Sequence, residues 1–390
     1  MFVIAYLANY NGMASWCWEA AHALHELGQP VLLICAEDIE LPGTPAVDIL
    51  RFNPQDYSQP SSQLFSRIRQ EVSNLSGQPS NFLNLLHHHL QQRGIQPSAY
   101  FLNMASLQHP TISTPQYVVG WAYPTSLMGY LAKVGTSTGW SFSKEAVRTG
   151  LSFLGWWRKD WSAYRSVTAV LAVSHKLERE LMAQDIRVHV VHPGTLVRPN
   201  QIPTSSTSPC KLLIAAENLE DPRKRVKWMI DALKAESQPN FKLTLAGAAS
   251  DAFQHWVCSN DFPAEFIGRV PRDQLQDVMA EQDVFLFGSR LDDWGYVLVE
   301  AMGQGLSIVA PNLSPFDEIV GDAGMLYSLS SSQEFRQKVH ELSRSNSLAQ
   351  RQAAWSRANR LFSRPAFGQS LLTAFSETNP SGAKCPVETC

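Results

Sequence analysis

The stretch Gly288–Gly305 constrains the fold more than any other part of the sequence, because it joins two buried strands through a loop and a short helix. It reads GSRLDDWGYVLVEAMGQG. The apolar run before it, Asp283–Phe287, predicts one buried strand, and Leu306–Ala310 after it predicts another. A helix that starts at Gly295 offers backbone N–H groups to an anion. The stretch therefore predicts an α/β domain with an anion-binding loop.

Two carboxylates stand on either side of the glycine in this stretch. Asp292 precedes Gly295, and Glu300 follows it within the predicted helix. Carboxylate oxygens accept hydrogen bonds from hydroxyl groups, whereas a helix start suits phosphate. The combination favours a polyhydroxylated ligand that carries phosphates.

The alternation of strand and helix begins at the N-terminus and begins again after a linker. Phe2–Ala8 predicts a strand, a loop with Gly12 follows, and a helix is expected over residues 16–27. The linker Pro199–Pro209 is rich in proline, serine and threonine. We therefore expect two consecutive α/β domains with largely parallel sheets and a ligand in the cleft between them.

The domain boundaries follow from this pattern. We place the first domain at residues 1–200 and the second at residues 201–363. The last helix, over residues 364–377, is expected to pack back on the first domain. Residues 378–390 are polar and are expected to form a disordered tail.

Charge and composition exclude some classes of partner. The net charge is −3 and the pI is near 6.4, so we expect no nucleic-acid partner. The six cysteines lack the spacing of metal ligands, which makes a reducing cytoplasm the simpler compartment. No basic region precedes the first strand, and no apolar run approaches the roughly 20 residues that span a bilayer. We therefore expect a cytoplasmic protein without a signal peptide.

Aromatic and basic residues alternate between Trp140 and Arg165. One interpretation is an interfacial amphipathic helix that touches anionic lipid at the inner face of the membrane. The other is a set of helices packed on the domain with solvated basic edges. Gly150 and Gly155 interrupt any long amphipathic face, which favours the second interpretation. Peripheral membrane contact remains the alternative.

A cluster of three cations marks the first loop of the second domain. Arg223, Lys224 and Arg225 follow the predicted strand Leu212–Ala216 and precede a helix that begins near Val226. Cations at a helix start suit a pyrophosphate. A solvated helix start explains the pattern equally well.

The order of motifs in the second domain resembles glycosyltransferase family 4, a large GT-B family of retaining enzymes. These motifs are DPRK, LAGA, FIGRV, DVFLFGS and DDWGYVLVEAMGQGLSIVAP. The resemblance covers nearly all of Cys210–Phe375 and is looser over the first domain. It implies a GT-B fold, with two Rossmann-like doubly wound parallel-sheet domains that face each other across a cleft.

The resemblance also implies which residues bind the donor, a nucleotide-diphosphate sugar. The implied donor site consists of Gly12, Asn218, Arg223, Lys224, Gly268, Arg269, Asp292, Trp294, Gly295, Tyr296, Val297 and Glu300. The three residues implied in catalysis are Asp292, Lys224 and Glu300. No metal ligand set and no cofactor are expected, because the sequence has no Asp-x-Asp motif.

The implied roles differ along the chain. Glu300, the second carboxylate of the family's E-x7-E motif, would hold the ribose hydroxyls, and Asp292 would contact the transferred sugar. Lys224 and the backbone N–H groups at the start of the last motif's helix would hold the phosphates. Gly12 would face the phosphates from the first domain, and the backbone at Arg269 would meet the base.

Three departures from the family pattern weaken the assignment of activity. The family's phosphate-binding arginine falls at Asn218, so a cation is missing unless Arg223 or Arg225 replaces it. The first carboxylate is Asp292, which is one methylene shorter than the usual glutamate. Trp121 stands at the strand end where the family usually has a histidine beside the sugar, and it would form a sugar-side wall.

The resemblance implies a retaining, metal-independent hexosyltransferase in polysaccharide or glycoconjugate biosynthesis. The acceptor would be a hydroxyl of a saccharide, a lipid-linked molecule or a small molecule. The alternative is a catalytically impaired GT-B-like protein that binds nucleotide sugars or serves as a scaffold. A dinucleotide-dependent oxidoreductase ranks last, because the three-glycine fingerprint is missing.

Overall fold

The computed structural model describes residues 1–6, 11–35, 45–51, 82–102, 111–120, 164–198, 209–235, 240–259, 262–292, 294–344 and 348–379. These residues form two compact units. The first contains the described parts of residues 1–194 and of the segment from Arg364 onward. The second contains the described parts of Thr195–Ser363. The division falls six residues before the predicted boundary at residue 200.

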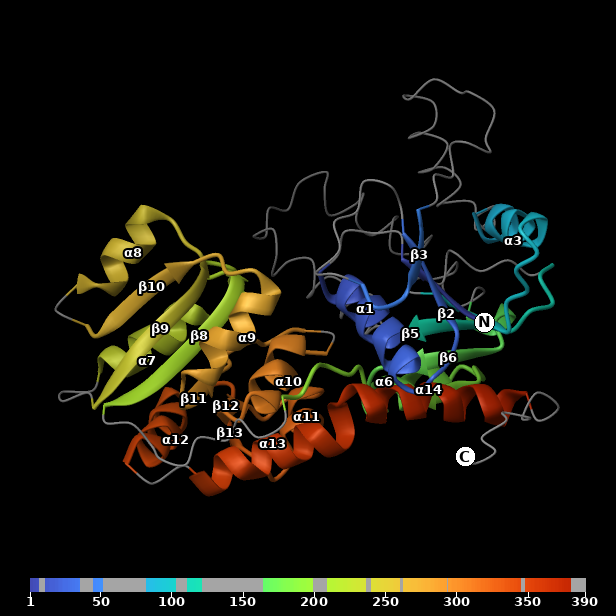
Figure 1. Ribbon diagram of the computed structural model, residues 1–390. Helices are drawn as coiled ribbons and strands as arrows, with labels where there is room; N and C mark the ends of the chain where they lie inside the picture. Colours follow the sequence, from blue (N-terminus) through green and yellow to red (C-terminus); the bar gives the residue numbers. More distant parts are fainter. Residues whose placement is uncertain are drawn as a thin grey trace, which may run out of the picture. The chain divides into compact units, whose positions relative to one another are not determined.

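The first unit is built on one parallel sheet of seven described strands (Figure 1). The strands are β1 (Phe2–Tyr6), β2 (Val31–Cys35), β3 (Asp48–Arg51), β4 (Ala99–Leu102), β5 (Gln116–Gly120), β6 (Ala169–Ala172) and β7 (Val188–Val190). Their order in the sheet is β3-β2-β1-β4-β5-β6-β7, and every pairing is parallel. Every residue of β2, β4, β5 and β6 is buried, as expected for strands covered on both faces.

The described helices of the first unit are α1 (Asn11–Glu26), α3 (Phe82–Gln92), α6 (His175–Met182) and α14 (Arg364–Thr378). The Oγ of Ser174 accepts a hydrogen bond from the N–H of Leu177 and so caps the start of α6. The predicted loop around Gly12 is wrong in one respect. The helix begins at Asn11, and Gly12 therefore lies in its first turn.

The C-terminal helix α14 belongs to the first unit, where it lies along α1 (Figure 1). Arg364, its first residue, donates a 2.6 Å hydrogen bond to the buried carboxylate of Glu19 and a 3.2 Å one to Glu26. Phe367 packs edge-on against Trp16. The helix extends to Thr378, which the sequence had placed in the disordered tail.

The second unit has its own parallel sheet, of six described strands. They are β8 (Cys210–Asn218), β9 (Phe241–Ala248), β10 (Ala264–Gly268), β11 (Val284–Leu286), β12 (Ser307–Pro311) and β13 (Met325–Tyr327). The order is β10-β9-β8-β11-β12-β13, again with parallel pairing throughout. The sequence analysis missed β3, β4 and β13, which have only three or four residues each.

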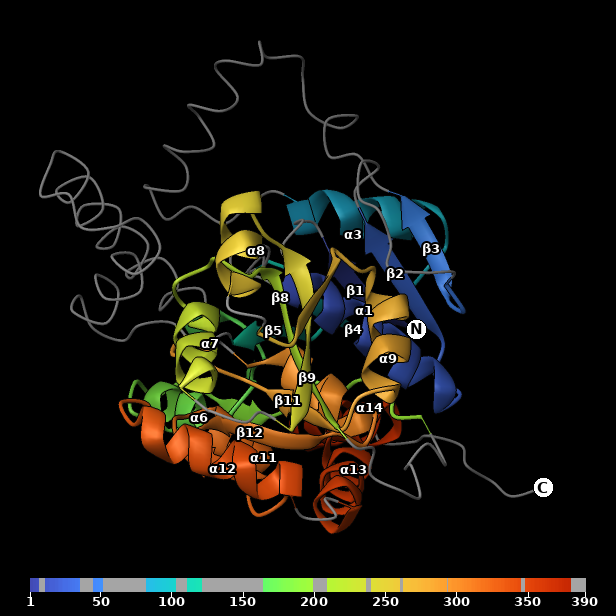
Figure 2. The same cartoon turned by 90° about the vertical axis from the view of Figure 1, so that its left-hand side faces the viewer.

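Helices cover both faces of the second sheet. They are α7 (Val226–Lys234), α8 (Asp251–Val257), α9 (Arg272–Ala280), α10 (Tyr296–Gly303), α11 (Phe316–Val320), α12 (Ser332–Arg344) and α13 (Leu348–Phe362). Figure 2 shows α7 and α12 together on one side of this sheet and α9 on the other. Both units are therefore doubly wound, as predicted.

The chain order reverses beside β8 in the second unit. From β8 the chain builds one half of the sheet outward through β9 and β10, and then returns to form β11 on the other side of β8. Ligands of open α/β sheets bind at the carboxyl ends of the strands at such a reversal. We therefore expect a ligand-binding site at the segments that follow β8 and β11.

Several sequence predictions lie outside the described residues. They concern Trp121, nearly all of the aromatic and basic segment 140–165, the linker except for Pro209, and the tail beyond Asn379. In the part of the chain that the structure describes, no helix is both long and apolar enough to cross a membrane.

Candidate functional site

Two loops meet at the carboxyl ends of β8 and β11. The first runs from Leu219 to α7, and the second runs from Phe287 to α10. The N–H of Arg290 donates to the carbonyl of Arg223 at 3.0 Å. A Cβ on Gly288 would lie 2.8 Å from the carbonyl oxygen of Lys224, so only glycine allows this close approach. The two loops are therefore held against each other by their backbones.

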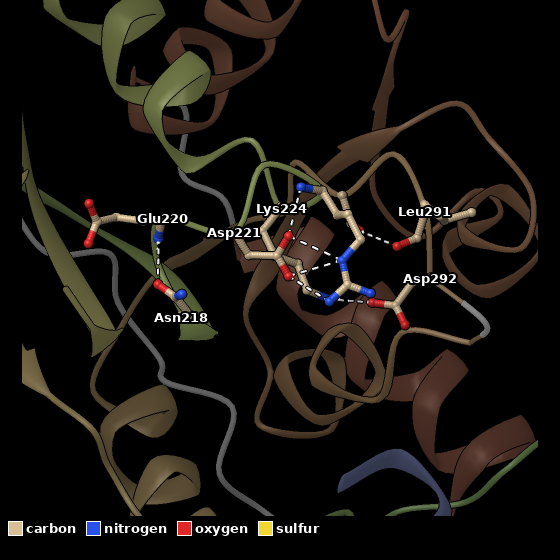
Figure 3. A network of polar contacts seen from close by, with 8 residues as sticks. Asn218, Glu220, Asp221, Lys224, Leu291 and Asp292 are labelled. Carbon is tan, nitrogen blue, oxygen red and sulfur yellow. Dashed lines mark hydrogen bonds and ion pairs between the residues drawn. The ribbon is translucent and has the colours of Figure 1, made fainter. Parts of the chain in front are cut away.

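Lys224 and Asp292 face each other across these loops (Figure 3). The ammonium Nζ of Lys224 lies 2.5 Å from Oδ2 of Asp292, and the two side chains are 26% and 27% exposed. The sequence analysis assigned these residues to phosphate and to sugar, respectively. In this structure they form one partly exposed ion pair at the point where the chain order reverses.

Glu300 lies deeper, on the buried side of α10. Its carboxylate is only 6% exposed, and Oε1 accepts a 2.6 Å hydrogen bond from Nε of Arg272. Arg272 is the first residue of α9, and its guanidinium lies 5.9 Å from the centre of the Tyr296 ring. A buried carboxylate needs such a partner because burial without a counter-charge is costly. Arg272 therefore holds Glu300 in a fixed orientation.

The start of α10 has the backbone geometry that the sequence predicts. Gly295 is the N-cap residue with φ of 99°, a left-handed conformation that favours glycine. The N–H of Leu298 donates to the carbonyl of Gly295 at 2.9 Å and begins the helix bonding. The N–H groups of a helix's first turn point out of its N-terminus, where they favour an anion. Tyr296 and Val297 occupy this first turn.

Arg223 is held by a carboxylate of its own loop. Its guanidinium makes hydrogen bonds of 2.7 to 3.1 Å with both carboxylate oxygens of Asp221. Burial alone raises the pKa of Asp221, but the hydrogen bonds and charge of Arg223 outweigh it and lower that pKa. The charge of Arg223 is therefore largely neutralised within the loop.

Asn218 ends β8, two residues beyond the predicted strand end. Its Oδ1 accepts a 2.9 Å hydrogen bond from the N–H of Glu220 (Figure 3). This is an Asx-type turn, which shapes the start of the loop. The amide thus supports the backbone and supplies no positive charge.

The residues predicted to meet the base follow β10. Gly268 has φ of 72°, and a Cβ placed there would meet no atom within 4 Å. Arg269 next to it pairs with Glu217 at 2.7 Å, and both side chains are more than half exposed. Glu217 lies near the end of β8. These residues therefore share the strand-end edge with the two loops.

Trp294 plays a different part from the one its place in the motif suggests. Its indole is 1% exposed and meets the ring of Phe362 edge-on at 5.7 Å. The side chain anchors the loop in the interior of the second unit. Tyr327 supports the same region, because its hydroxyl donates to the carbonyl of Phe287 at 3.1 Å. Any contact of Trp294 with a ligand falls to its backbone.

Three residues that hold the charged side chains of the site in place could not be predicted from the sequence. These are Glu217, Asp221 and Arg272. Pro271 before Arg272 marks a helix start and was the only available signal for that arginine. Its pairing with Glu300 joins residues 28 positions apart, which no local pattern shows.

A family model described as "Glycosyl transferases group 1" matches residues 210–345. An uncharacterized glycosyltransferase from Methanocaldococcus jannaschii is 28% identical over 130 residues, which are 33% of this chain and 37% of the relative. The Escherichia coli O-antigen chain mannosyltransferase B is 27% identical over 114 residues, 27% of this chain and 30% of the relative. These matches thus span only about a third of the length of either relative.

Solved structures match over almost the whole chain. Sucrose-phosphate synthase from Thermosynechococcus elongatus has a TM-score of 0.67 at 13% identity, with 97% of this chain and 99% of that chain covered. HepE from Anabaena, in complex with UDP and glucose, has a TM-score of 0.60 at 17% identity, with 96% and 99% covered. At these identities the likeness concerns the fold.

The fold and the strand-end site define a protein of the GT-B class, with two Rossmann-like parallel-sheet domains. Within it, the second domain matches the glycosyl transferases group 1 model over residues 210–345. This domain contains every site residue described above, from Glu217 to Glu300.

Proposed function

We propose that the chain is a retaining glycosyltransferase that moves a hexose from a nucleotide-diphosphate sugar to an acceptor hydroxyl. The observation that carries the proposal is the Lys224–Asp292 pair at the chain reversal, beside the N-terminus of α10. A cation and a helix start suit a diphosphate, and a carboxylate suits sugar hydroxyls. The group 1 match over the same residues supports it.

In this proposal the donor's ribose hydroxyls donate to Glu300, whose carboxylate Arg272 already orients at 2.6 Å. The first-turn N–H groups of α10 bind the diphosphate. Asp292 has two carboxylate oxygens, so it accepts a sugar hydroxyl while it remains paired with Lys224. The base lies along the backbone at Arg269.

The proposed reaction breaks the bond between the anomeric carbon and the diphosphate oxygen. Both electrons of that bond leave with the diphosphate, and the sugar develops oxocarbenium character. Lys224 and the helix dipole stabilise the growing negative charge. The acceptor oxygen forms the new bond on the same face, and its proton passes to the departing diphosphate. The acceptor is a saccharide, a lipid-linked molecule or a small molecule, and no metal takes part.

The similarity to a mannosyltransferase and to a structure that contains UDP and glucose guides the choice of donors for the test. We propose to incubate the protein with UDP-, GDP- and ADP-sugars, including GDP-mannose and UDP-glucose, and to measure release of the nucleoside diphosphate. The expected result is turnover with one donor that falls at least 100-fold in Glu300→Gln. Turnover that is equal in the two proteins would remove Glu300 from the donor site.

A second candidate function is a GT-B-like protein that binds nucleotide sugars without transferring them. Asn218 favours it, because it replaces a cation and supports a turn instead. Binding of a nucleotide sugar without hydrolysis or transfer would decide for this candidate. Peripheral contact with the inner face of a cytoplasmic membrane is a separate proposal, for which co-sedimentation with anionic vesicles is the test.

A further inference from the structure

Most cations of the strand-end site are already paired with an acid. The pairs are Arg223–Asp221, Lys224–Asp292, Arg269–Glu217 and Arg272–Glu300. Arg225 and Arg290 differ, because within the described part of the chain neither has a hydrogen bond or an ion pair from its side chain to an acid. Because these two arginines keep their positive charge while the other four cations are paired, an external anion would be attracted to them.

Arg225 is half-buried and not satisfied. Its Nη1 is buried without a hydrogen-bond partner among the described residues. The guanidinium lies 3.9 Å from the ring centre of Trp228, which supports its face but accepts no hydrogen bond in the guanidinium plane. Nη1 therefore lacks the acceptor that a buried N–H group requires, and a phosphate oxygen is an acceptor of this kind.

The backbone of Arg225 is held in an unusual conformation. Its φ of 55° and ψ of 30° are left-handed, and Arg225 is the N-cap residue of α7. A non-glycine side chain is uncommon there. A glycine or asparagine would fit more easily at a helix boundary. The arginine therefore adopts a backbone conformation that costs free energy.

Arg290 lies next to Arg225 because the two loops touch. The N–H of Arg290 bonds to the carbonyl of Arg223, and Gly288 lies against the carbonyl of Lys224. Burial lowers the pKa of Arg225, the Tyr327 side chain opposes this, and the charge of Arg290 lowers the pKa further. Two like charges that interact in this way destabilise each other, and an anion beside them relieves the repulsion.

We propose that Arg225 and Arg290 form an anion site for a phosphate group, adjacent to but separate from the Lys224–Asp292 pair. The phosphate comes either from the donor's diphosphate or from another phosphorylated ligand. If it is the donor's, the inference rests on the proposed function, and this pair replaces the cation missing at Asn218. Arg223 does not replace that cation, since Asp221 neutralises it.

The test compares three single variants with the wild-type protein. Arg225→Gly removes one guanidinium and fits the left-handed backbone. Arg290→Gln removes the other. Lys227→Gln is the matched control, because Lys227 is an exposed cation of α7 that pairs with Asp231 at 3.5 Å. Calorimetric titration with pyrophosphate, with UDP, GDP and ADP, and with the corresponding nucleosides gives the affinities.

We expect Arg225→Gly and Arg290→Gln each to weaken pyrophosphate binding about tenfold, the typical effect of losing a charged hydrogen bond. Lys227→Gln should bind as the wild type does, and nucleoside binding should not change in any variant. A nucleoside diphosphate that follows the same pattern identifies the donor as the source of the phosphate. Pyrophosphate binding with the same pattern, but without any nucleoside diphosphate binding, would support the anion site and contradict the proposed donor.

The unfolding temperature is a second readout, and it distinguishes an anion-binding role of Arg225 from a purely structural one. Without phosphate, Arg225→Gly should unfold at the same or a higher temperature, because it removes the left-handed arginine and the like-charge contact. With pyrophosphate, it should lose most of the stabilisation that the wild type gains. Wild-type affinity in both arginine variants would overturn the proposal, as would an equal loss in all three variants or a lower unfolding temperature of Arg225→Gly without phosphate.

Discussion

The two ends of the Gly288–Gly305 stretch place their carboxylates in different surroundings. Asp292, at the loop end, is 27% exposed and pairs with a lysine that is equally exposed. Glu300, at the helix end, is 6% exposed and pairs with an arginine at the start of another helix. An exposed ion pair contributes little to stability and exchanges easily, whereas a buried one is fixed by its surroundings. The motif therefore combines an adaptable acid with a preoriented one.

The largest effect on stability is expected from breaking the helix-end pair. Arg272→Met leaves the Glu300 carboxylate buried without a cation and should lower the free energy of unfolding by about 3 kcal/mol. Urea denaturation measures this loss. The double variant Arg272→Met/Glu300→Leu is the control, because it removes both charges and should recover part of the loss. A single variant as stable as the wild type would show that Glu300 is not held by Arg272.

The loop end is tested through its backbone. Gly288→Ala adds a Cβ 2.8 Å from both the carbonyl oxygen of Lys224 and the sulfur of Met229. It should force the two loops apart at a cost of about 1–3 kcal/mol. Gly303→Ala is the matched control, since its Cβ would make only ordinary contacts, at 3.4 Å from Val197 and beyond. Equal stability of the two variants in urea denaturation would count against the close approach.

The loop-end ion pair itself should matter less for stability. Asp292→Asn is expected to change the free energy of unfolding by less than about 1 kcal/mol, since both partners are partly exposed. If the proposed function holds, turnover should nevertheless fall by about tenfold or more, because the charge that orders Lys224 is lost. Denaturation and donor turnover measured on one preparation separate the two effects. If Asp292→Asn lost as much stability as Arg272→Met, the expected difference between the loop-end and the helix-end ion pair would be contradicted.

The smallest effect on stability is expected at Asp221, the acid that pairs with Arg223 in the loop after β8. Burial raises the pKa of the Asp221 carboxyl, but the hydrogen bonds and charge of Arg223 outweigh this and lower that pKa below its ordinary value. A carboxyl whose pKa is lower in the folded state stabilises the protein above its unfolded pKa and loses this contribution as the pH falls through the folded one. Asp221→Asn should therefore cost up to about 1 kcal/mol at pH 7 and nothing once Asp221 is fully protonated. Denaturation at several acidic pH values measures the difference, and a cost that does not depend on pH would contradict it.

The sequence was informative where local pattern decides structure. Buried apolar runs located β1, β8, β11 and β12, and the glycine start of α10 was correctly placed. The short strands β3 and β4 escaped because four residues carry little periodicity. The start of α1 was set too late, since the polar segment at Asn11 resembles a loop. Local signals thus found the elements better than their ends.

The candidate site shows the same limit. Asp292 and Lys224 were predicted together through a resemblance, and the structure places their charged atoms 2.5 Å apart. Arg272 was missed because its partner Glu300 is reached only through the packing of α9 against α10. The left-handed backbone of Arg225 could not be predicted from the sequence either, because arginine has no preference for this conformation. Tertiary contacts and backbone strain must be seen in the structure.

Hydrogen exchange with and without a bound nucleotide sugar tests the central claim most directly, because it locates the ligand on the chain. The account predicts slower exchange in the loop that follows β8, at residues 219–225, and at the start of α10 around Gly295, with little change in α12. The Glu300→Gln variant should show much less protection at the same ligand concentration. Protection confined to other segments, with exchange at these two unchanged, would contradict the placement of the donor site.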